Sequence, residues 1–518
     1  MPNYAGRCLT LFGTASIQNY IFSSNLLAEN SGASEAVFQA LEYWRNNAQA
    51  TETIYVGGGN AAVIFANRDA ALRSTRDWSL DLARDFPGLR VVAGHAIVGG
   101  RGLRVAYEEA LRELYEAESG PPFGSPLGAL PVVRTCPSTN LGASSRYEDP
   151  DGTVSWFSAE AAGKHSMADE AFNRFLGRVY REVLINSSLR PGFPRRLEEL
   201  GVTEGASQIA VVHADGDGLG AVVRSIVDDG TLSDDEFAQA LSRFSMRADE
   251  LAWDAFRQTI LDLVSTRDQW TTEEIQPTDD RSDFLIPLRA IVWGGDDLTF
   301  VTNGRLGLAV TARYLHNYSL KAREYLSEWL PLEQDTFTSS AGVAIVPLKF
   351  PFSRAYDIAE ELAGQAKKRR AEQPERGSWL DFQIVMEGAS DSLEGTRRAL
   401  YPPHIMEGWG RPYRVDNGAD GQPQGPWATL QEDWQRFAGT GQANGSPPWP
   451  RSRSKKLLEA IMQQGPALNA VEQANKARGY ALPDRNIPFA RYFDALELMD
   501  FYKPIDWTNR PQAPGGVR

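Results

Sequence analysis

The chain has 518 residues, 42% of them hydrophobic and 23% charged, a composition that predicts several folded domains and excludes extended disorder. The formal net charge of -14 argues against non-specific binding to nucleic-acid backbones as the main activity, because that activity needs a basic surface. Neither a basic leader before an apolar stretch nor a run of about 18 apolar residues occurs, so we expect no membrane partner and a cytoplasmic location.

The chain contains two cysteines, Cys8 and Cys136, which are far apart in the sequence. Two cysteines cannot build a disulfide framework or a four-cysteine zinc site. We therefore expect no disulfide partner for either thiol, which fits a reducing compartment.

The first predicted unit is a domain over residues 1–120. It has an acid-free strand LTLFGTAS, a hairpin that turns at GGGN (57–60), a strand at 91–98 and a helical pattern at 103–117. Without acids the unit should bind no catalytic metal. The retained glycines indicate that the hairpin lies close to a nucleotide, although a tight turn alone also explains them.

Residues 121–200 are predicted to connect this unit to the next. The part from 120 to 165 is rich in Gly, Pro and Ser, which is typical of a long connection with little regular structure, and helices follow it.

The second unit, predicted over 201–390, repeats the first in the same order. The segments 290–301, 339–346 and 352–368 correspond to 54–66, 91–98 and 103–117. A strand, helices, a hairpin, a further strand and a helix are typical of a sheet backed by helices on one face. We predict an α+β fold with two ferredoxin-like palm domains, the first of them degenerate.

The acids of the second unit follow two predicted strands. Asp215 and Asp217 end the strand that contains IAVV, and Asp296 and Asp297 lie in the GGDD hairpin turn. Carboxylate oxygens suit Mg²⁺ or Mn²⁺, which leave coordination positions to water and phosphate oxygens. Such ions would activate an attacking ribose hydroxyl and neutralise a triphosphate. The sequence therefore predicts a metal site for nucleotidyl transfer.

Other interpretations exist for each motif alone. HADGDGLG also fits a strand followed by an ordinary Asx-rich turn, and GGDD also fits a plain hairpin. A calcium loop would place an oxygen ligand and a glutamate where Leu219 and Ile226 stand, so an EF-hand is excluded. The occurrence of both motifs in one domain, each after an apolar strand, favours the metal site.

Residues 391–518 are predicted to form a mostly helical C-terminal domain. A Gly/Pro/Trp-rich stretch at 407–450 precedes helical patterns at SKKLLEAIMQQ and ARYFDALELMDFY.

The combined motifs resemble the palm of the large subunit of type III CRISPR effector complexes. The resemblance rests on DGDGLG, GGDD and the segment SSAGVAIVPLKFPFSRAYDIAEELAGQAKK, with further similarity at SIQNYIFSSNLLAENSGAS (16–34) and SRSKKLLEAI. The chain lacks a His-Asp pair near its N-terminus and the family's zinc-binding cysteine pairs, so we expect neither the family's HD nuclease domain nor its DNA cleavage.

The resemblance implies specific roles. Asp215 and Asp296 would be metal ligands and Asp297 would complete the catalytic set. The residues implied in nucleotide binding are Gly216, Asp217, Gly294, Gly295, Ser340 and Lys367. A serine that enters a strand is also a common backbone cap, and Lys367, within KKRR, also fits a solvated helix end.

The resemblance also implies an activity. The chain would use ATP, or another nucleoside triphosphate, to make cyclic oligoadenylate second messengers in antiviral defence, with guide RNA and other effector subunits as partners. A catalytically silent nucleotide sensor or a structural subunit is the main alternative. Two further alternatives are less favoured. A diguanylate cyclase would pair two identical palms, whereas this chain contains its own degenerate partner palm. A template-dependent polymerase would need a basic channel, which the acidic composition does not indicate.

Overall fold

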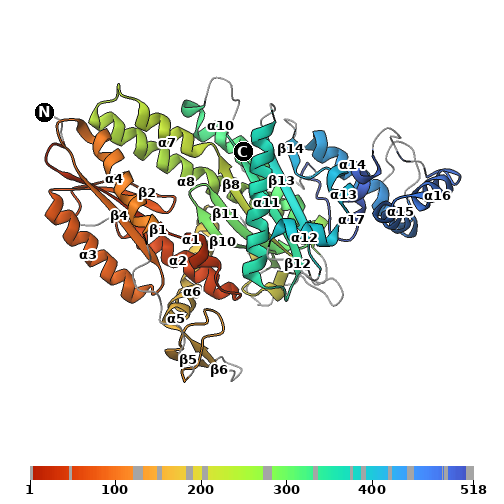
Figure 1. Cartoon of the computed structure of the whole chain (residues 1–518), viewed down its shortest axis with the longest axis horizontal. Coiled ribbons are helices and arrows are strands. Elements are labelled where there is room, and N and C mark those ends of the chain that lie inside the picture. Colours follow the sequence, from red (N-terminus) through yellow and green to blue (C-terminus); the bar gives the residue numbers. More distant parts are fainter. Residues whose placement is uncertain are drawn as a thin grey trace.

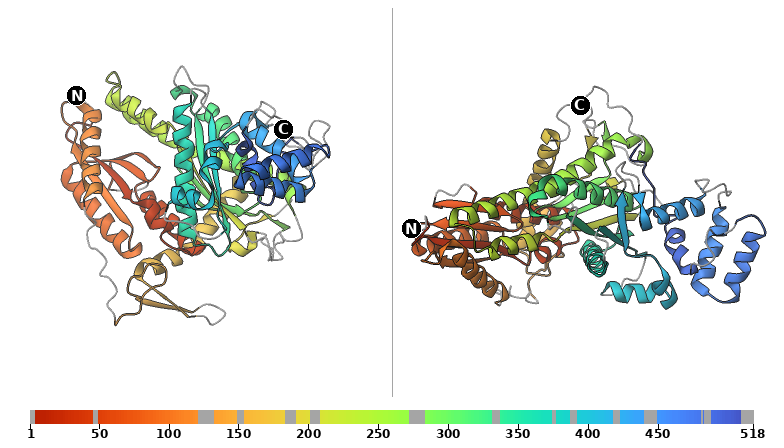
Figure 2. Two further views of the ribbon diagram at one scale, coloured as in Figure 1. Left: turned by 45° about the vertical axis from the view of Figure 1, so that its right-hand side comes forward. Right: turned by 90° about the horizontal axis from the view of Figure 1, so that it is seen from above.

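The structure is a computed structural model with three parts in a row and a smaller projection (Figures 1 and 2). It describes residues 4–45, 49–120, 132–148, 154–182, 191–200, 208–271, 283–330, 337–373, 377–386, 392–417, 423–439, 449–480, 482 and 488–508. Parts of the predicted connection and of the stretch at 407–450 lie outside these residues. Among the described helices, none is both long and apolar enough to span a membrane.

The first part is a four-stranded sheet with the order β2-β3-β1-β4. Its elements are β1 (Cys8–Ala15), α1 (Ile17–Phe22), α2 (Leu27–Glu42), β2 (Glu52–Gly57), β3 (Asn60–Phe65), α3 (Arg68–Asp85), β4 (Arg90–Ile97) and α4 (Gly102–Ser119). One face of the sheet is closed by aromatic packing, because Phe12 stacks on Trp44 at 3.9 Å between ring centroids and meets Trp78 edge-on at 5.0 Å.

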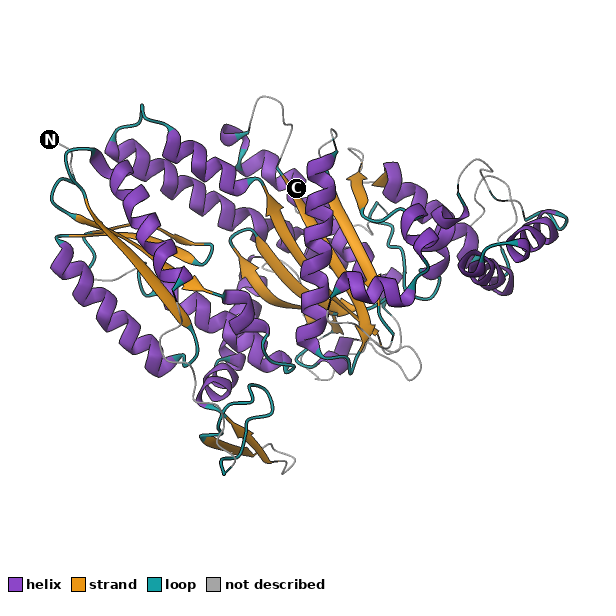
Figure 3. Ribbon diagram, in the orientation of Figure 1, coloured by secondary structure: helices purple, strands orange, loops and turns teal. Residues whose placement is uncertain are grey.

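The second part is a seven-stranded sheet with the order β10-β11-β8-β12-β13-β14-β15. Its elements are β8 (Gln208–Asp217), α7 (Leu219–Asp228), α8 (Asp234–Ser265), α9 (Arg267–Trp270), β9 (Phe284–Leu285), β10 (Leu288–Gly294), β11 (Asp297–Asn303), α10 (Gly307–Tyr325), η2 (Ser327–Trp329), β12 (Thr338–Pro347), α11 (Phe352–Glu372) and β13 (Ser378–Ile384). The colouring by secondary structure in Figure 3 shows the long helices against this sheet.

The predicted repeat is present in the topology. The order β10-β11-β8-β12 reproduces β2-β3-β1-β4, and the hairpins β2–β3 and β10–β11 both carry a register shift in their first strand. Gly94 in β4 and Gly342 in β12 hold the same position: an added Cβ at either would lie 2.0 Å from a carbonyl oxygen of the covering helix, α4 or α11. The predicted α+β fold with two palm domains is confirmed.

The connecting region forms a projection that the sequence did not resolve into strands. It contains β5 (Ser145–Glu148), β6 (Val154–Phe157), α5 (Ala159–Ser166), α6 (Ala168–Glu182), β7 (Pro191–Gly192) and η1 (Leu197–Leu200). Cys136 lies in the small core of this projection, and both it and Cys8 are buried free thiols. Figure 1 shows β5, β6 and α5 extending away from both sheets.

The C-terminal part is helical, as predicted, with one addition. Its elements are α12 (Leu393–Leu400), α13 (Pro403–Gly408), β14 (Tyr413–Asn417), β15 (Pro423–Gln424), α14 (Gly425–Ala438), α15 (Arg451–Gln463), α16 (Pro466–Lys476), η3 (Phe489–Tyr492) and α17 (Phe493–Glu497). The strands β14 and β15 extend the sheet of the second palm, because Trp379 of β13 pairs with Arg414 of β14. The sequence did not indicate these two strands.

Candidate functional site

Three of the predicted acids converge where β8 ends beside the β10–β11 hairpin. Asp215 lies near the end of β8, and the backbone N–H of Gly216 donates to the carbonyl of Asp296 at 3.2 Å, which joins the strand to the hairpin. One carboxylate oxygen from each of Asp215, Asp296 and Asp297 lies within 4.8 Å of the others. The half-buried cluster thus brings together the two residues predicted as metal ligands and Asp297, the third residue of the predicted catalytic set.

The electrostatics of this cluster favour a cation. Burial raises the pKa of Asp296 well above its usual range, and repulsion from Asp297 and Asp215 raises it further. Burial and the charge of Asp215 raise the pKa of Asp297 in the same way. Three carboxylates that oppose one another's ionisation form a donor set that a divalent cation would stabilise.

Lys367 is the one predicted nucleotide-binding side chain that reaches the acids. Its Nζ forms an ion pair with Asp215 from α11, and the lysine side chain is 44% exposed. Burial alone would lower the pKa of Lys367, but the hydrogen bond and charge of Asp215 raise it overall. Lys367 is therefore fully protonated and lies at the edge of the acid cluster.

Asp217 and Ser340 lie in the interior beside α11. The Ser340 hydroxyl donates to Asp217 at 3.1 Å, the Thr338 hydroxyl donates to it at 2.9 Å, and Arg370 Nε lies 3.2 Å from it. Asp217 is 1% exposed and Ser340 is fully buried. Asp217 is thus bound within the fold rather than in the acid cluster, and its predicted nucleotide contact, like that of Ser340, stays a prediction.

Two of the three predicted glycines, Gly216 and Gly295, are required by close packing around the hairpin. A Cβ at Gly216 would lie 2.4 Å from the Tyr318 hydroxyl and 2.9 Å from Asp296 Cβ. Gly295 has a φ of 65° and meets the backbone of Gly58, whereas Gly294 ends β10 with ordinary space around it. These contacts explain the glycines at 216 and 295 without a ligand.

The hairpin is held by residues that no motif indicates. Asp249 of α8 accepts a hydrogen bond from the Gly295 N–H at 3.0 Å. Trp293, just before the two glycines, has the Arg174 guanidinium 4.1 Å from its ring centroid and the Trp253 ring 5.1 Å away. Because Arg174 comes from α6, no spacing in the sequence indicates that it lies beside the hairpin.

Two buried tyrosines lie behind the acids on α10. Tyr314 and Tyr318 are fully buried, and neither hydroxyl has a hydrogen-bond partner in the described part of the chain. Burial raises the pKa of both, and the charges of Asp296 and Asp215 raise it further. Their hydroxyls therefore stay protonated as donors beside the cluster.

Three cavities meet at the two hairpin acids, between the two palms, and Asp215 lines none of them. The largest, of about 600 Å³, reaches Asp296 from the side of α7 and α8. A second, of about 320 Å³, reaches Asp297 beside His213, and a third, of about 150 Å³, contains the Gly57–Gly59 turn together with both acids of GGDD. The hairpin acids can therefore be reached through cavities that residues of both palms line.

Comparison with a family model identifies the second palm. Residues 208–375 match the model described as Cas10/Cmr2, second palm domain. This segment contains all the predicted site residues, and the match confirms the resemblance seen in the sequence. No curated protein sequence matches the chain.

Solved structures match nearly the whole chain. Csm1 of T. onnurineus and a Csm1–Csm4 subcomplex of the type III-A CRISPR-Csm interference complex are each 14% identical, with a TM-score of 0.50. Both matches cover 96% of this chain and 70% of the other. A Csm1–Csm4 cassette in complex with cA3 matches at a TM-score of 0.49 and 14% identity, over 97% and 70% of the two chains. At this identity the first two likenesses establish the fold.

Proposed function

We propose that this chain, whose residues 208–375 form a Cas10/Cmr2-type second palm, is a metal-dependent nucleotidyltransferase that converts ATP into cyclic oligoadenylate-type second messengers. The observation that carries the proposal is the cluster of Asp215, Asp296 and Asp297, whose two hairpin acids lie where three cavities meet. Asp217, by contrast, is buried beside Arg370 and lines none of these cavities.

The donor set fits Mg²⁺ or Mn²⁺. Asp215, Asp296 and Asp297 would hold the ions, and the raised pKa values of the two hairpin acids reflect the excess of negative charge that a cation would offset. When bound, the metal ions would supply Lewis-acid activation of a ribose hydroxyl and neutralise charge on the triphosphate.

The largest cavity has the size and lining for a nucleoside triphosphate. Its volume of about 600 Å³ lies within the range of small-molecule sites. Leu219 and Gly220, at the start of α7, and Arg224 line it. Amide groups at a helix start bind phosphate, and α7 begins immediately after the positive-φ residue Gly218. We infer that the triphosphate lies along α7, with the base toward the apolar side chains of Tyr107 and Leu241.

Lys367 would position the phosphates. Its Nζ pairs with Asp215 and its side chain is 44% exposed, so it can exchange the carboxylate for a phosphate oxygen when a metal binds Asp215. A protonated lysine at this edge would also offset the negative charge that builds up on departing pyrophosphate.

The first palm would hold the acceptor nucleotide. Its GGGN turn has no carboxylate, yet Gly57, Gly58 and Asn60 line the same cavity as Asp296. A nucleotide bound against this acid-free turn could present its ribose hydroxyl to a triphosphate on the second palm. This arrangement gives the degenerate palm a substrate-binding role.

Adenine preference, association with guide RNA, and assembly with other effector subunits are proposed from the resemblance. The Csm1–Csm4 subcomplex indicates one type of partner, a Csm4-like subunit. The cytoplasmic location and the role in antiviral defence belong to the same proposal.

The test is incubation of the purified protein with radiolabelled ATP or GTP and Mg²⁺ or Mn²⁺, with product masses compared with those of an Asp296→Ala, Asp297→Ala variant. We expect pyrophosphate and cyclic or linear oligonucleotides that the variant does not make. If no product forms with or without co-purifying RNA while nucleotide still binds, the chain is a sensor or a structural subunit instead.

A further inference from the structure

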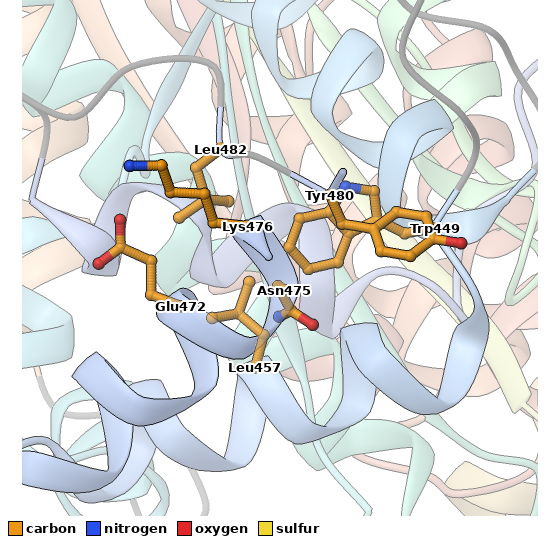
Figure 4. Close-up of a pocket in the computed structure, with 7 residues that line it drawn as sticks. All are labelled: Trp449, Leu457, Glu472, Asn475, Lys476, Tyr480 and Leu482. Carbon is orange, nitrogen blue, oxygen red and sulfur yellow. The ribbon is translucent and has the colours of Figure 1, made fainter. Parts of the chain in front are cut away.

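Two hollows lie in the C-terminal half, away from the acids. The first, between α15, α16 and the segment after them, has a volume of about 10 Å³, which is room for one water at most. Its lining is Trp449, Leu457, Glu472, Asn475, Lys476, Tyr480 and Leu482 (Figure 4). The hollow is therefore too small for a ligand.

The second hollow has a different size and charge. It has a volume of about 320 Å³ and lies where the end of α11, strands β13 and β14 and the C-terminal helices meet. Three arginines line it, Arg369, Arg414 and Arg491, and no acid is among the described residues that line it. In a chain with a net charge of -14, three guanidinium groups gathered around one cavity form a local anion-binding surface.

The three arginines come from three elements, Arg369 from α11, Arg414 from β14 and Arg491 from η3. Arg414 lies directly opposite Trp379 in the β13–β14 ladder, and Arg491 Nη1 donates to the Tyr413 hydroxyl at 3.1 Å. Arg369 is more exposed, and Glu372 on the same helix is its distant ion partner at 3.8 Å. Guanidinium groups with fixed planes recognise phosphate through paired hydrogen bonds.

The hollow also has aromatic walls. Trp379 and Trp409 line it, with Gly410 and Pro412 between the strands and α13. Trp379 is 7% exposed, and its buried indole N–H has no hydrogen-bond partner within the described ranges. The indole N–H is thus buried in the wall of the hollow, and Trp379 and Trp409 are the aromatic side chains against which a ligand would lie.

We propose that this hollow binds one phosphate-bearing nucleotide, either free or as part of a single-stranded RNA. Arginine beside tryptophan is the combination that binds single-stranded nucleic acid, with guanidinium groups on the phosphate and aromatic rings against the base or sugar. A volume of about 320 Å³ at the lower end of ligand cavities limits the occupant to about one nucleotide.

The hollow is separate from the acid cluster, although α11 contributes to both. Lys367 and Arg370 point to Asp215 and Asp217, whereas Arg369 lines the hollow. One residue step turns a helix by about 100°, so Arg369 leaves the helix on a different side from Arg370. Binding here needs neither metal nor the acids.

The test is fluorescence anisotropy of a labelled octa-uridine RNA with the full chain at a fixed low salt concentration. Arg369→Glu should weaken binding by about tenfold, whereas Lys368→Glu, an exposed charge reversal at the adjacent position, should change it less than about twofold. Arg414→Gln provides a second variant, and thermal unfolding confirms that each variant is folded.

Two further measurements distinguish a free nucleotide from RNA as the ligand, and the hollow from the acid cluster. Competition by AMP would show that a free nucleotide is sufficient, and competition by unlabelled RNA but not by AMP would show that an RNA strand is needed; either result supports the proposal. The Asp296→Ala, Asp297→Ala variant should bind the RNA as the unchanged chain does, whatever the result of the ATP assay. Equal losses in Arg369→Glu and Lys368→Glu, absence of binding of both the RNA and labelled AMP, or equal competition by inorganic phosphate or an oligoglutamate peptide would overturn the proposal.

Discussion

Gly295 of the acid hairpin lies directly against Gly58 of the first palm: a Cβ on Gly295 would be 2.9 Å from the Cα of Gly58. Both residues have positive φ, 65° and 59°, so the two equivalent turns of the repeat meet through their glycine backbones. The first palm thereby supports the turn that carries Asp296 and Asp297, which gives its glycines a structural role even without a bound nucleotide.

This contact predicts different effects for two alanine substitutions. Gly295→Ala and Gly58→Ala share the left-handed backbone cost of roughly 1–2 kcal/mol. A Cβ at Gly58, however, would meet nothing within 4 Å, whereas one at Gly295 would push the hairpins apart. We expect Gly295→Ala to weaken Mn²⁺ binding in calorimetry by about tenfold, a change of about 1.4 kcal/mol, and Gly58→Ala to leave it nearly unchanged. Equal affinities for both variants would mean that the contact does not position the acids.

The pairing of Lys367 with Asp215 predicts that removal of the lysine charge leaves metal binding intact but lowers turnover. In Lys367→Gln, Asp215 loses its ion-pair partner, so Mn²⁺ should bind as tightly as before or more tightly. Turnover of ATP should fall by about tenfold or more, because a phosphate-binding cation is lost. Calorimetry and product assays check both effects, with Lys368→Gln as the matched control. A loss of metal affinity in Lys367→Gln would show instead that the lysine shapes the acid cluster.

The sequence predicted the fold because the repeat is encoded locally. Glycine-bounded apolar runs at 54–66 and 290–301 correspond to the two hairpins, and Gly94 and Gly342 hold equivalent strand positions under a helix. The strands β14 and β15 could not be predicted in this way. They are short edge strands whose pairing depends on a neighbour, Trp379, that is distant in sequence.

The site was predicted only in part, because the spacing of the acids does not show which of them are buried in the fold and which lie in the acid cluster. Asp215 and Asp217 look equivalent in DGD, yet the first lies in the acid cluster and the second is 1% exposed beside Arg370. The difference comes from α11, more than a hundred residues later in the chain. For the same reason Asp249 and Trp293, which hold the hairpin through tertiary contacts, had no sequence signal.

This difference predicts opposite phenotypes for two conservative substitutions. Asp217→Asn leaves Arg370, which is 16% exposed, without its charge partner, and should destabilise the fold by roughly 3 kcal/mol. Asp215→Asn leaves only the half-exposed Lys367 and should hardly change the unfolding temperature, while Mn²⁺ binding is lost. Thermal unfolding and calorimetry on both variants make the comparison. An unchanged unfolding temperature in Asp217→Asn, with loss of nucleotide binding, would favour the predicted nucleotide contact instead.

The hydroxyl of Tyr318, which has no hydrogen-bond partner among the described residues, predicts a stabilising substitution. A buried hydroxyl without a hydrogen bond costs about 1–3 kcal/mol, so Tyr318→Phe should raise the unfolding temperature of the metal-free protein. Tyr413→Phe is the control with the opposite sign, because its hydroxyl donates to Asp494 at 2.7 Å and accepts from Arg491. If Tyr318→Phe is destabilising, the hydroxyl has a partner, such as a bound water between it and the acids.

The raised pKa of Asp433, on α14, predicts how the stability of the fold depends on pH. Burial raises its pKa to about 6, an effect that Arg436 and Arg491 only partly offset, whereas the ordinary value is 3.8. Between these values the folded state keeps a proton that the unfolded state has lost, so stability falls as pH rises through this window and stays lower above it.

The cost at neutral pH is on the order of 2–3 kcal/mol. Asp433→Asn should therefore raise the unfolding temperature at pH 7.5 relative to the unchanged chain by more than it does at pH 4.5. Glu432→Gln, at the exposed neighbouring position, removes only the smallest contribution to the raised pKa of Asp433 and should show a much smaller difference between the two pH values. A constant offset of Asp433→Asn at both pH values would mean that this carboxyl is ionised throughout, and that Arg436 and Arg491 outweigh its burial.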